Sequence, residues 1–152
     1  MLNSDLTGAL DGATGVEMRQ ARSCSDSGSL PWFQMIPLYE LPRMAPATVG
    51  IVKEHGPAPC PLCRRDGFFF KNKPVTIRYE LDLDDVPDVS HTYEYFGLSV
   101  LREPLAKSHF AQPLPIVRGS VYARLTAAGA RDVAGYPVEV IDHASQLSKT
   151  AT

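Results

Sequence analysis

The chain lacks the features that would place it at once in a functional class. Its apolar runs are only a few residues long, so we expect no membrane-spanning helix and no membrane contact. The net charge is −2, without the general basic signature of nucleic-acid-binding domains. The N-terminus shows no basic segment followed by an apolar core, as a signal peptide would. Three cysteines, an odd number, and the missing export signal together favour a reducing cytoplasm.

Motifs of the common catalytic frames are also missing. The sequence contains no Gly-x-Ser-x-Gly, no His-Glu-x-x-His, no phosphate-binding P-loop and no Gly-x-Gly-x-x-Gly. A thiol can be combined with several histidines, but such a pairing is combinatorial and forms no motif. We therefore expect a protein that is not an enzyme.

Length and composition favour one globular α+β domain. A chain of 152 residues suits a single core, and its 44% hydrophobic and 21% charged residues are ordinary for a globular protein. Thirteen prolines break the chain into short elements. We predict a mostly antiparallel small sheet with one or two short helices and a Cys-x-x-Cys knuckle loop. The domain would span residues 30–143, after a weakly patterned, flexible segment 1–29 and before a polar tail 144–152.

Alternation of apolar and polar residues predicts the strands. The clearest case is residues 74–83, where alternate positions are apolar and would face a core: Ile77, Tyr79, Leu81 and Leu83. Residues 30–39 are rich in large apolar side chains and predict a largely buried strand that contains Trp32. Residues 91–95 predict a further strand.

The C-terminal third predicts a strand, a helix and a strand that pack as one unit. Residues 114–117 and 136–141 have strand patterns, and residues 121–128 have a helical one. Ser120 is the expected N-cap of the helix, and Gly129 the residue that ends it.

Site chemistry concentrates in residues 55–70, where Cys60 and Cys63 stand two residues apart in a Pro/Gly-rich stretch. A Cys-x-x-Cys pair on a tight turn supplies half of a tetrahedral zinc site, which needs four ligands. We predict Cys24 and His55 as the other ligands of a structural Zn²⁺ ion. The remaining candidates are His91, His109 and His143. Two alternatives stay open: two reduced thiols in a knuckle without metal, and a redox site.

An acidic cluster follows the strand predicted at residues 74–83. It consists of Asp82, Asp84, Asp85 and Asp88. The simpler interpretation is a solvated strand end and turn. The functional interpretation is an anionic face for a basic partner, such as a nuclease.

Aromatic and basic residues adjoin the cysteine pair. Phe68, Phe69 and Phe70 are consecutive, so they cannot all face inward on a strand, and at least one should be exposed. We take Phe69, Arg64 and Arg65 as candidate contacts with a partner.

The stretch from Pro59 to Phe69 resembles the Cys-x-x-Cys-Gly knuckle of the double-CXXCG motif proteins. These are small cytoplasmic proteins found notably in myxobacteria, and they include immunity proteins that protect a cell from toxins delivered by its kin. Residues 115–138 are similar to the strand–helix–strand ending of that group. The family carries two such knuckles, whereas this chain has one, with Arg64 where the family has glycine.

The resemblance implies a non-catalytic cytoplasmic protein that neutralises a cognate protein toxin by binding it. The alternative is a small zinc-knuckle regulatory module that contacts nucleic acid or another protein. Arg64 and Arg65, with Lys71 and Lys73, would supply its phosphate contacts. The net charge disfavours nucleic acid as the main partner.

Overall fold

The fold is that of a computed structural model, which describes seven parts of the chain. They are residues 2–23, 28–53, 65, 67–71, 74–97, 111–131 and 135–141. Within these parts no helix is long and apolar enough to cross a membrane. The predicted knuckle loop and the C-terminal tail lie outside the described residues.

The chain divides into two compact units, and each is built from three separate stretches of sequence. Unit 1 comprises Met1–Glu40, Val86–His91 and Pro115–Ala134. Unit 2 comprises Leu41–Asp85, Thr92–Leu114 and Gly135–Thr152. Strands β7 (Val89–Phe96) and β8 (Gln112–Val117) contribute residues to both units.

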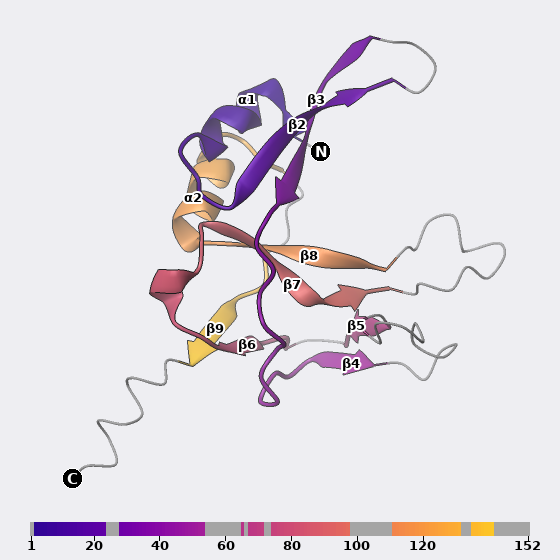
Figure 1. Ribbon diagram of the computed structural model, residues 1–152, viewed down its shortest axis with the longest axis vertical. Coiled ribbons are helices and arrows are strands. Elements are labelled where there is room, and N and C mark those ends of the chain that lie inside the picture. The colour runs from indigo at the N-terminus through magenta and orange to yellow at the C-terminus, as the bar shows by residue number, and fades with distance from the viewer. Residues whose placement is uncertain are drawn as a thin grey trace, which may run out of the picture. The chain divides into compact units, whose positions relative to one another are not determined.

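Unit 1 contains a three-stranded antiparallel sheet (Figure 1). The central strand β3 (Ser29–Pro37) pairs with β1 (Leu2–Asn3) on one side and with β2 (Val16–Arg22) on the other. A register shift between Gln20 and Arg22 interrupts the β2–β3 ladder. The alternation of Val16, Met18 and Ala21 against exposed charged side chains lets one face of β2 be partly buried.

Short helices cover the core of unit 1. The helix α1 (Ser4–Thr7) runs directly into the 3₁₀ turn η1 (Gly8–Leu10), and η1 lies against α2 (Gly119–Ala127) (Figure 1). Four buried residues form this core: Leu10, Val89, Val121 and Leu125. Val121 and Leu125 are one helical turn apart, so a single face of α2 is buried.

A four-stranded sheet has the order β4-β5-β7-β8. Its strands β4 (Ile51–Lys53) and β5 (Phe68–Phe70) are antiparallel, whereas β5 and β7 are parallel. Along β7 burial alternates as the pleat requires: Thr92, Glu94 and Phe96 are buried, and the residues between them are half-buried.

A two-stranded parallel sheet belongs wholly to unit 2. It pairs β6 (Ile77–Glu80) with β9 (Val138–Ile141), so that Ile77 lies opposite Val138 and Glu80 opposite Ile141. The 3₁₀ turn η2 (Leu83–Asp85) follows β6. Buried apolar side chains of unit 2 include Leu41, Ala45, Val75, Ile77 and Tyr79.

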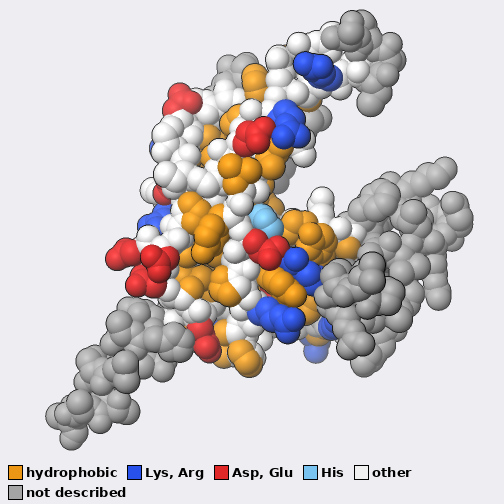
Figure 2. Space-filling model, in the orientation of Figure 1, with side chains coloured by type: hydrophobic (Ala, Val, Ile, Leu, Met, Phe, Trp, Pro, Cys, Tyr) orange, Lys and Arg blue, Asp and Glu red, His pale blue; other side chains and the backbone are white. Residues whose placement is uncertain are grey.

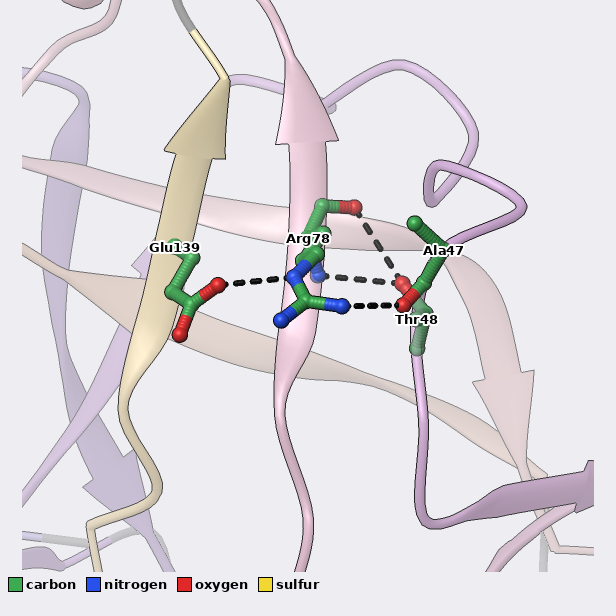
Figure 3. Close-up of polar contacts among 4 residues, drawn as sticks. All are labelled: Ala47, Thr48, Arg78 and Glu139. Atoms are coloured by element: carbon green, nitrogen blue, oxygen red, sulfur yellow. Dashed lines mark hydrogen bonds and ion pairs between the residues drawn. The ribbon is translucent and has the colours of Figure 1, made fainter.

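Arg78 joins the two-stranded sheet to the loop before β4 (Figure 3). Its Nε donates to Glu139 Oε2 at 2.7 Å, and its Nη1 donates to the carbonyl oxygen of Ala47 at 2.7 Å. The backbone N–H of Arg78 donates to Thr48 Oγ1 at 3.0 Å, and the amide of Ala45 donates to the Arg78 carbonyl at 2.7 Å. The outer edge of β6 is therefore occupied by this loop.

The α+β class is confirmed, because strands predominate and the helices are short. The prediction of one mostly antiparallel sheet is too simple, since the strands form three small sheets and two of the pairs are parallel. The predicted strand–helix–strand unit is wrong in its packing. Its first strand, β8, lies next to β7, and its last strand, β9, lies next to β6 in another sheet.

Other local predictions hold in part. The strand predicted at residues 74–83 is confirmed only at Ile77–Glu80, with Ile77 and Tyr79 buried as expected. Trp32 lies on β3 as predicted but is 44% exposed, so its assignment to the core is wrong. α2 begins at Gly119 with Arg118 as N-cap, which displaces Ser120 from that role. Gly129, with φ of 88°, follows the helix end as predicted.

Candidate functional surfaces

Three surface features of unit 2 carry chemistry that a partner can use. They are an aromatic stack, an acidic turn and an arginine–tyrosine cluster, each defined below. The predicted zinc ligands are not among them, because Cys24, His55, Cys60 and Cys63 lie outside the described residues. Among the residues that the structure describes, no three His, Cys, Asp or Glu side chains form a metal-binding group. The zinc site therefore stays a prediction.

The aromatic stack consists of Phe96, Phe70 and Tyr136. The ring of Phe70 lies between the other two, with centroid separations of 5.0 Å to each and interplanar angles of 23° and 26°. Phe96 is buried, whereas Phe70 is 39% exposed and Tyr136 is 41% exposed. Nearly parallel rings at this separation attract one another beyond the effect of burial. The stack is thus an apolar surface that begins in the core and ends in solvent.

Strand geometry places these rings together. Phe68 lies opposite Phe96 in the parallel β5–β7 ladder, so Phe68, Phe70 and Phe96 share one face of the sheet. Tyr136 reaches the stack from the segment just before β9. Phe68 packs on Phe96 with centroids 6.2 Å apart, and Lys53 Nζ lies 5.3 Å from the Phe68 centroid.

The three consecutive phenylalanines differ in exposure and in the face of β5 on which they lie. The expectation that at least one is exposed is confirmed at Phe70. Phe69, the predicted partner contact, is half-buried and so less exposed than Phe70, and it lies on the opposite face of β5. Phe70 and Tyr136 were not predicted as partner contacts. The period of two in β5 distinguishes Phe70 from Phe69, but no sequence signal joins Phe70 to Tyr136, since sheet topology brings them together.

The acidic turn consists of Asp82, Asp84 and Asp85, which are all exposed. The carboxylate of Asp82 accepts a hydrogen bond from the backbone N–H of Asp84 at 2.9 Å and so fixes the start of η2. None of the three forms an ion pair with another described residue. Figure 2 shows acidic side chains gathered over the turn between β6 and β7. The turn therefore presents negative charge that no described neighbour neutralises through an ion pair.

Asp88, the fourth member of the predicted cluster, is used inside unit 1. One carboxylate oxygen accepts hydrogen bonds from the backbone N–H of Thr14 at 2.9 Å and from Thr14 Oγ1 at 3.0 Å. Arg118 Nε lies 3.7 Å from the other oxygen. These hydrogen bonds, with help from Arg118, lower the pKa of Asp88 below its usual value. Asp88 thus links the Thr14 turn to the start of β7, whereas the hydrogen bond of Asp82 is local to the acidic turn.

The arginine–tyrosine cluster consists of Arg43, Arg65, Tyr93 and Tyr95. Arg65 Cζ lies 3.8 Å from the ring centroid of Tyr93 and 5.0 Å from that of Tyr95. Arg65 Nε also donates to the Tyr93 carbonyl oxygen at 2.8 Å. Arg43 Cζ lies 5.1 Å from the Tyr93 centroid. The predicted basic contact Arg65 is therefore held against aromatic rings, while Arg64 lies outside the described residues.

Unit 2 also buries two polar atoms that lack hydrogen-bond partners among the described residues. They are the hydroxyl of Tyr79, a fully buried residue, and Oε2 of Glu94. The other carboxylate oxygen of Glu94 accepts from the backbone N–H of Met44 at 2.9 Å. Burial, and secondarily the charge of Glu94, raise the pKa of Tyr79 far above its ordinary value. The phenol is therefore held neutral beyond the pH at which an ordinary tyrosine titrates.

Comparison with other proteins does not extend this description. The chain matches no protein-family model, no curated protein and no solved structure.

Proposed function

We propose that the protein is a non-catalytic, cytoplasmic immunity-type protein that neutralises a cognate protein toxin by binding it. The observation that carries the proposal is the aromatic stack, whose outer rings Phe70 and Tyr136 stay about two-fifths exposed. Contiguous exposed aromatic surface is unfavourable in water and marks sites of association. Aromatic side chains are also enriched among the residues that dominate protein–protein binding.

Packing within the stack supports the same proposal. Phe70 packs against both Phe96 and Tyr136, with a centroid separation of 5.0 Å to each. Side chains that are ordered before binding lose little conformational entropy when a partner covers them. A tight stoichiometric inhibitor benefits from such an ordered surface.

The acidic turn indicates the chemistry of the partner. Three exposed carboxylates, none ion-paired within the described part of the chain, attract a protein with a basic surface and raise the rate of encounter. Toxins that act on nucleic acid are basic at their active sites, because they bind phosphates. We therefore propose a basic toxin, with the acidic turn as the steering element and the aromatic stack as the anchor.

A second candidate function is supported by the arginine–tyrosine cluster. Basic side chains beside aromatic rings are also used to bind single-stranded nucleic acid. This observation keeps the zinc-knuckle regulatory module as the alternative, with Cys60 and Cys63 holding part of the metal site. The −2 net charge and the acidic turn favour the protein partner over nucleic acid.

The test is protection of cells and formation of a complex. The probe is the product of the gene beside this one, expressed alone and together with this chain. The proposal predicts that this product stops growth, that co-expression restores it, and that the two chains co-purify in a fixed ratio. Growth arrest without rescue, or rescue without a complex, would contradict it. Salt-dependent binding of a single-stranded oligonucleotide that Arg65→Ala abolishes would favour the alternative.

A further inference from the structure

Cationic side chains of this chain lie over aromatic rings on both faces of the four-stranded sheet. On one face, Lys53 Nζ lies 5.3 Å from the centroid of the Phe68 ring. On the other face, Arg65 Cζ lies 3.8 Å from the Tyr93 centroid and 5.0 Å from the Tyr95 centroid. The face of an aromatic ring is negatively polarised and attracts a cation. Contacts between cations and rings are therefore a recurring feature of unit 2.

Tyr136, the outer ring of the aromatic stack, presents a ring face to solvent, whereas Phe70 presents an edge. Phe70 packs between two nearly parallel rings, those of Phe96 and Tyr136, so the surface that it exposes lies at the ring edge. One side of the Tyr136 ring packs on Phe70, and the residue is still 41% exposed. Its exposed surface therefore lies away from Phe70. Because a cation prefers the face of a ring to its positively polarised edge, Tyr136 is the member of the stack suited to bind one.

We infer that the outer face of Tyr136 binds a cationic side chain, an arginine or a lysine, of the partner protein. This inference rests on the proposed function, since it names the group of the partner that the aromatic stack contacts. The approach to the ring is open, because its chain neighbours Gly135 and Pro137 are both exposed and glycine has no side chain. The contact of Arg65 with Tyr93 shows that a guanidinium packs on a tyrosine ring in this unit.

The charges of unit 2 favour a cation over an apolar group at this ring. Glu139, three residues after Tyr136, has a side chain that is more than half exposed. The acidic turn adds three exposed carboxylates to the same unit. Such charges attract a cationic group. A purely apolar partner surface would instead take water from nearby carboxylates and give them no new partner, which is unfavourable.

The test varies the charge distribution of the ring at residue 136 and measures the Kd of the neighbouring gene product by titration calorimetry. The variants are Tyr136→Phe and three forms of it in which the new ring carries one, two or three fluorine atoms. Fluorine withdraws electron density from the ring face and changes the size of the ring little. We expect Kd to rise with each fluorine, by roughly 5- to 30-fold in all. Tyr136→Leu, which stays apolar but has no ring, should weaken binding by a similar factor.

The matched control is the same series at Tyr122, a tyrosine of similar exposure on α2, and it should leave Kd unchanged. Circular dichroism must show that the variants fold, and the fluorinated rings keep the test valid if Tyr136→Leu unfolds. A Kd that does not depend on fluorine would overturn the inference and leave the proposed function standing. So would Tyr136→Leu with wild-type affinity. The absence of any binding by the wild type would contradict both.

Discussion

At the scale of single residues, the polar groups with incomplete or unusual hydrogen bonding are the most informative. Tyr79 and Glu94 bury polar atoms without partners among the described residues, while Asp88 collects several donors. Buried polar atoms without partners lower the free energy of unfolding unless a water molecule bonds to them. The hydrogen bonds to Asp88 raise it. Both can be measured by single substitutions.

Replacing Tyr79 by phenylalanine should leave the free energy of unfolding unchanged or raise it by up to about 1 kcal/mol, because a buried hydroxyl without a partner is removed. Urea denaturation of both proteins at pH 7 measures the difference. A loss above about 1 kcal/mol would show that the hydroxyl is bonded, for instance through a buried water. Tyr79→Ala is the comparison, and it should cost about 3–5 kcal/mol through the cavity that it leaves.

Tyr79→Phe should also change how the free energy of unfolding responds to alkali. The pKa of Tyr79 is raised on folding, whereas the phenol of the unfolded chain titrates near pH 10. The folded state therefore holds the proton more tightly, and stability falls as the pH rises above about 10. Stability should decline more steeply in the wild type than in Tyr79→Phe between about pH 9 and 11. Parallel curves would contradict the assignment.

Asp88→Asn should change the response to acid. The pKa of Asp88 is lowered on folding, chiefly by the Thr14 hydrogen bonds, so its contribution is present above about pH 4 and is lost as the pH falls further. The wild type should be the more stable protein at pH 7, and the difference should shrink below pH 4. Asp84→Asn removes a charge without removing those hydrogen bonds and serves as the control. A difference that does not depend on pH would contradict the account.

At the scale of elements, the sequence pattern predicts individual strands and helices but not which strands pair with one another. The period of two predicted β6, and the helical spacing predicted α2 with Gly129 after its end. The strand predicted at residues 91–95 lies within β7. The partners of β8 and β9 were not predictable, since nothing in their sequences specifies a neighbour that lies distant in the chain. Trp32 was assigned to the core by its size, but β3 exposes that position.

The turn at Gly15 offers a direct test of local backbone constraints. Gly12 and Gly15 have nearly equal positive φ values of 74° and 76°, but only a Cβ on Gly15 would overlap the carbonyl oxygen of Val89. Gly12→Ala should therefore cost about 1 kcal/mol, from the left-handed conformation alone. Gly15→Ala should cost at least about 2 kcal/mol more, because the chain must shift. Equal losses in urea denaturation would show that the contact between Gly15 and β7 is loose.

The link between β6 and β9 can be measured through Arg78. Glu139 is more than half exposed, so Glu139→Gln should cost below about 1 kcal/mol, and less at high salt. Arg78→Ala also removes the donor to the Ala47 carbonyl and should cost about 1 kcal/mol more. A double-mutant cycle in urea separates the Arg78–Glu139 interaction from the other effects of the two substitutions. Arg19→Ala, from an exposed ion pair on β2, is the control that should cost little. Equal losses for Arg78→Ala and Glu139→Gln would contradict a role for the Ala47 contact.

At the scale of the whole molecule, binding surfaces were only partly visible in the sequence. The acidic turn could be predicted from Asp82, Asp84 and Asp85, which are adjacent in the chain, but the separate structural role of Asp88 could not. The aromatic stack joins Phe70, Phe96 and Tyr136 from three distant segments, so only the fold brings it together. The predicted zinc ligands and Arg64 lie outside the described residues and stay predictions. Metal analysis of the wild type and of Cys60→Ser tests them.

The most direct test of the central claim is the affinity of the chain for the product of the neighbouring gene, measured by titration calorimetry. Phe70→Ala and Tyr136→Ala together remove the outer rings of the aromatic stack, and we expect a loss of at least about 2 kcal/mol, or roughly 30-fold in Kd. Tyr122→Ala removes a matched aromatic ring, 39% exposed on α2, and should leave Kd unchanged. Tight one-to-one binding that the double variant weakens, with both variants folded, is the predicted result. No binding by the wild type, or equal affinity of all three proteins, would contradict the account.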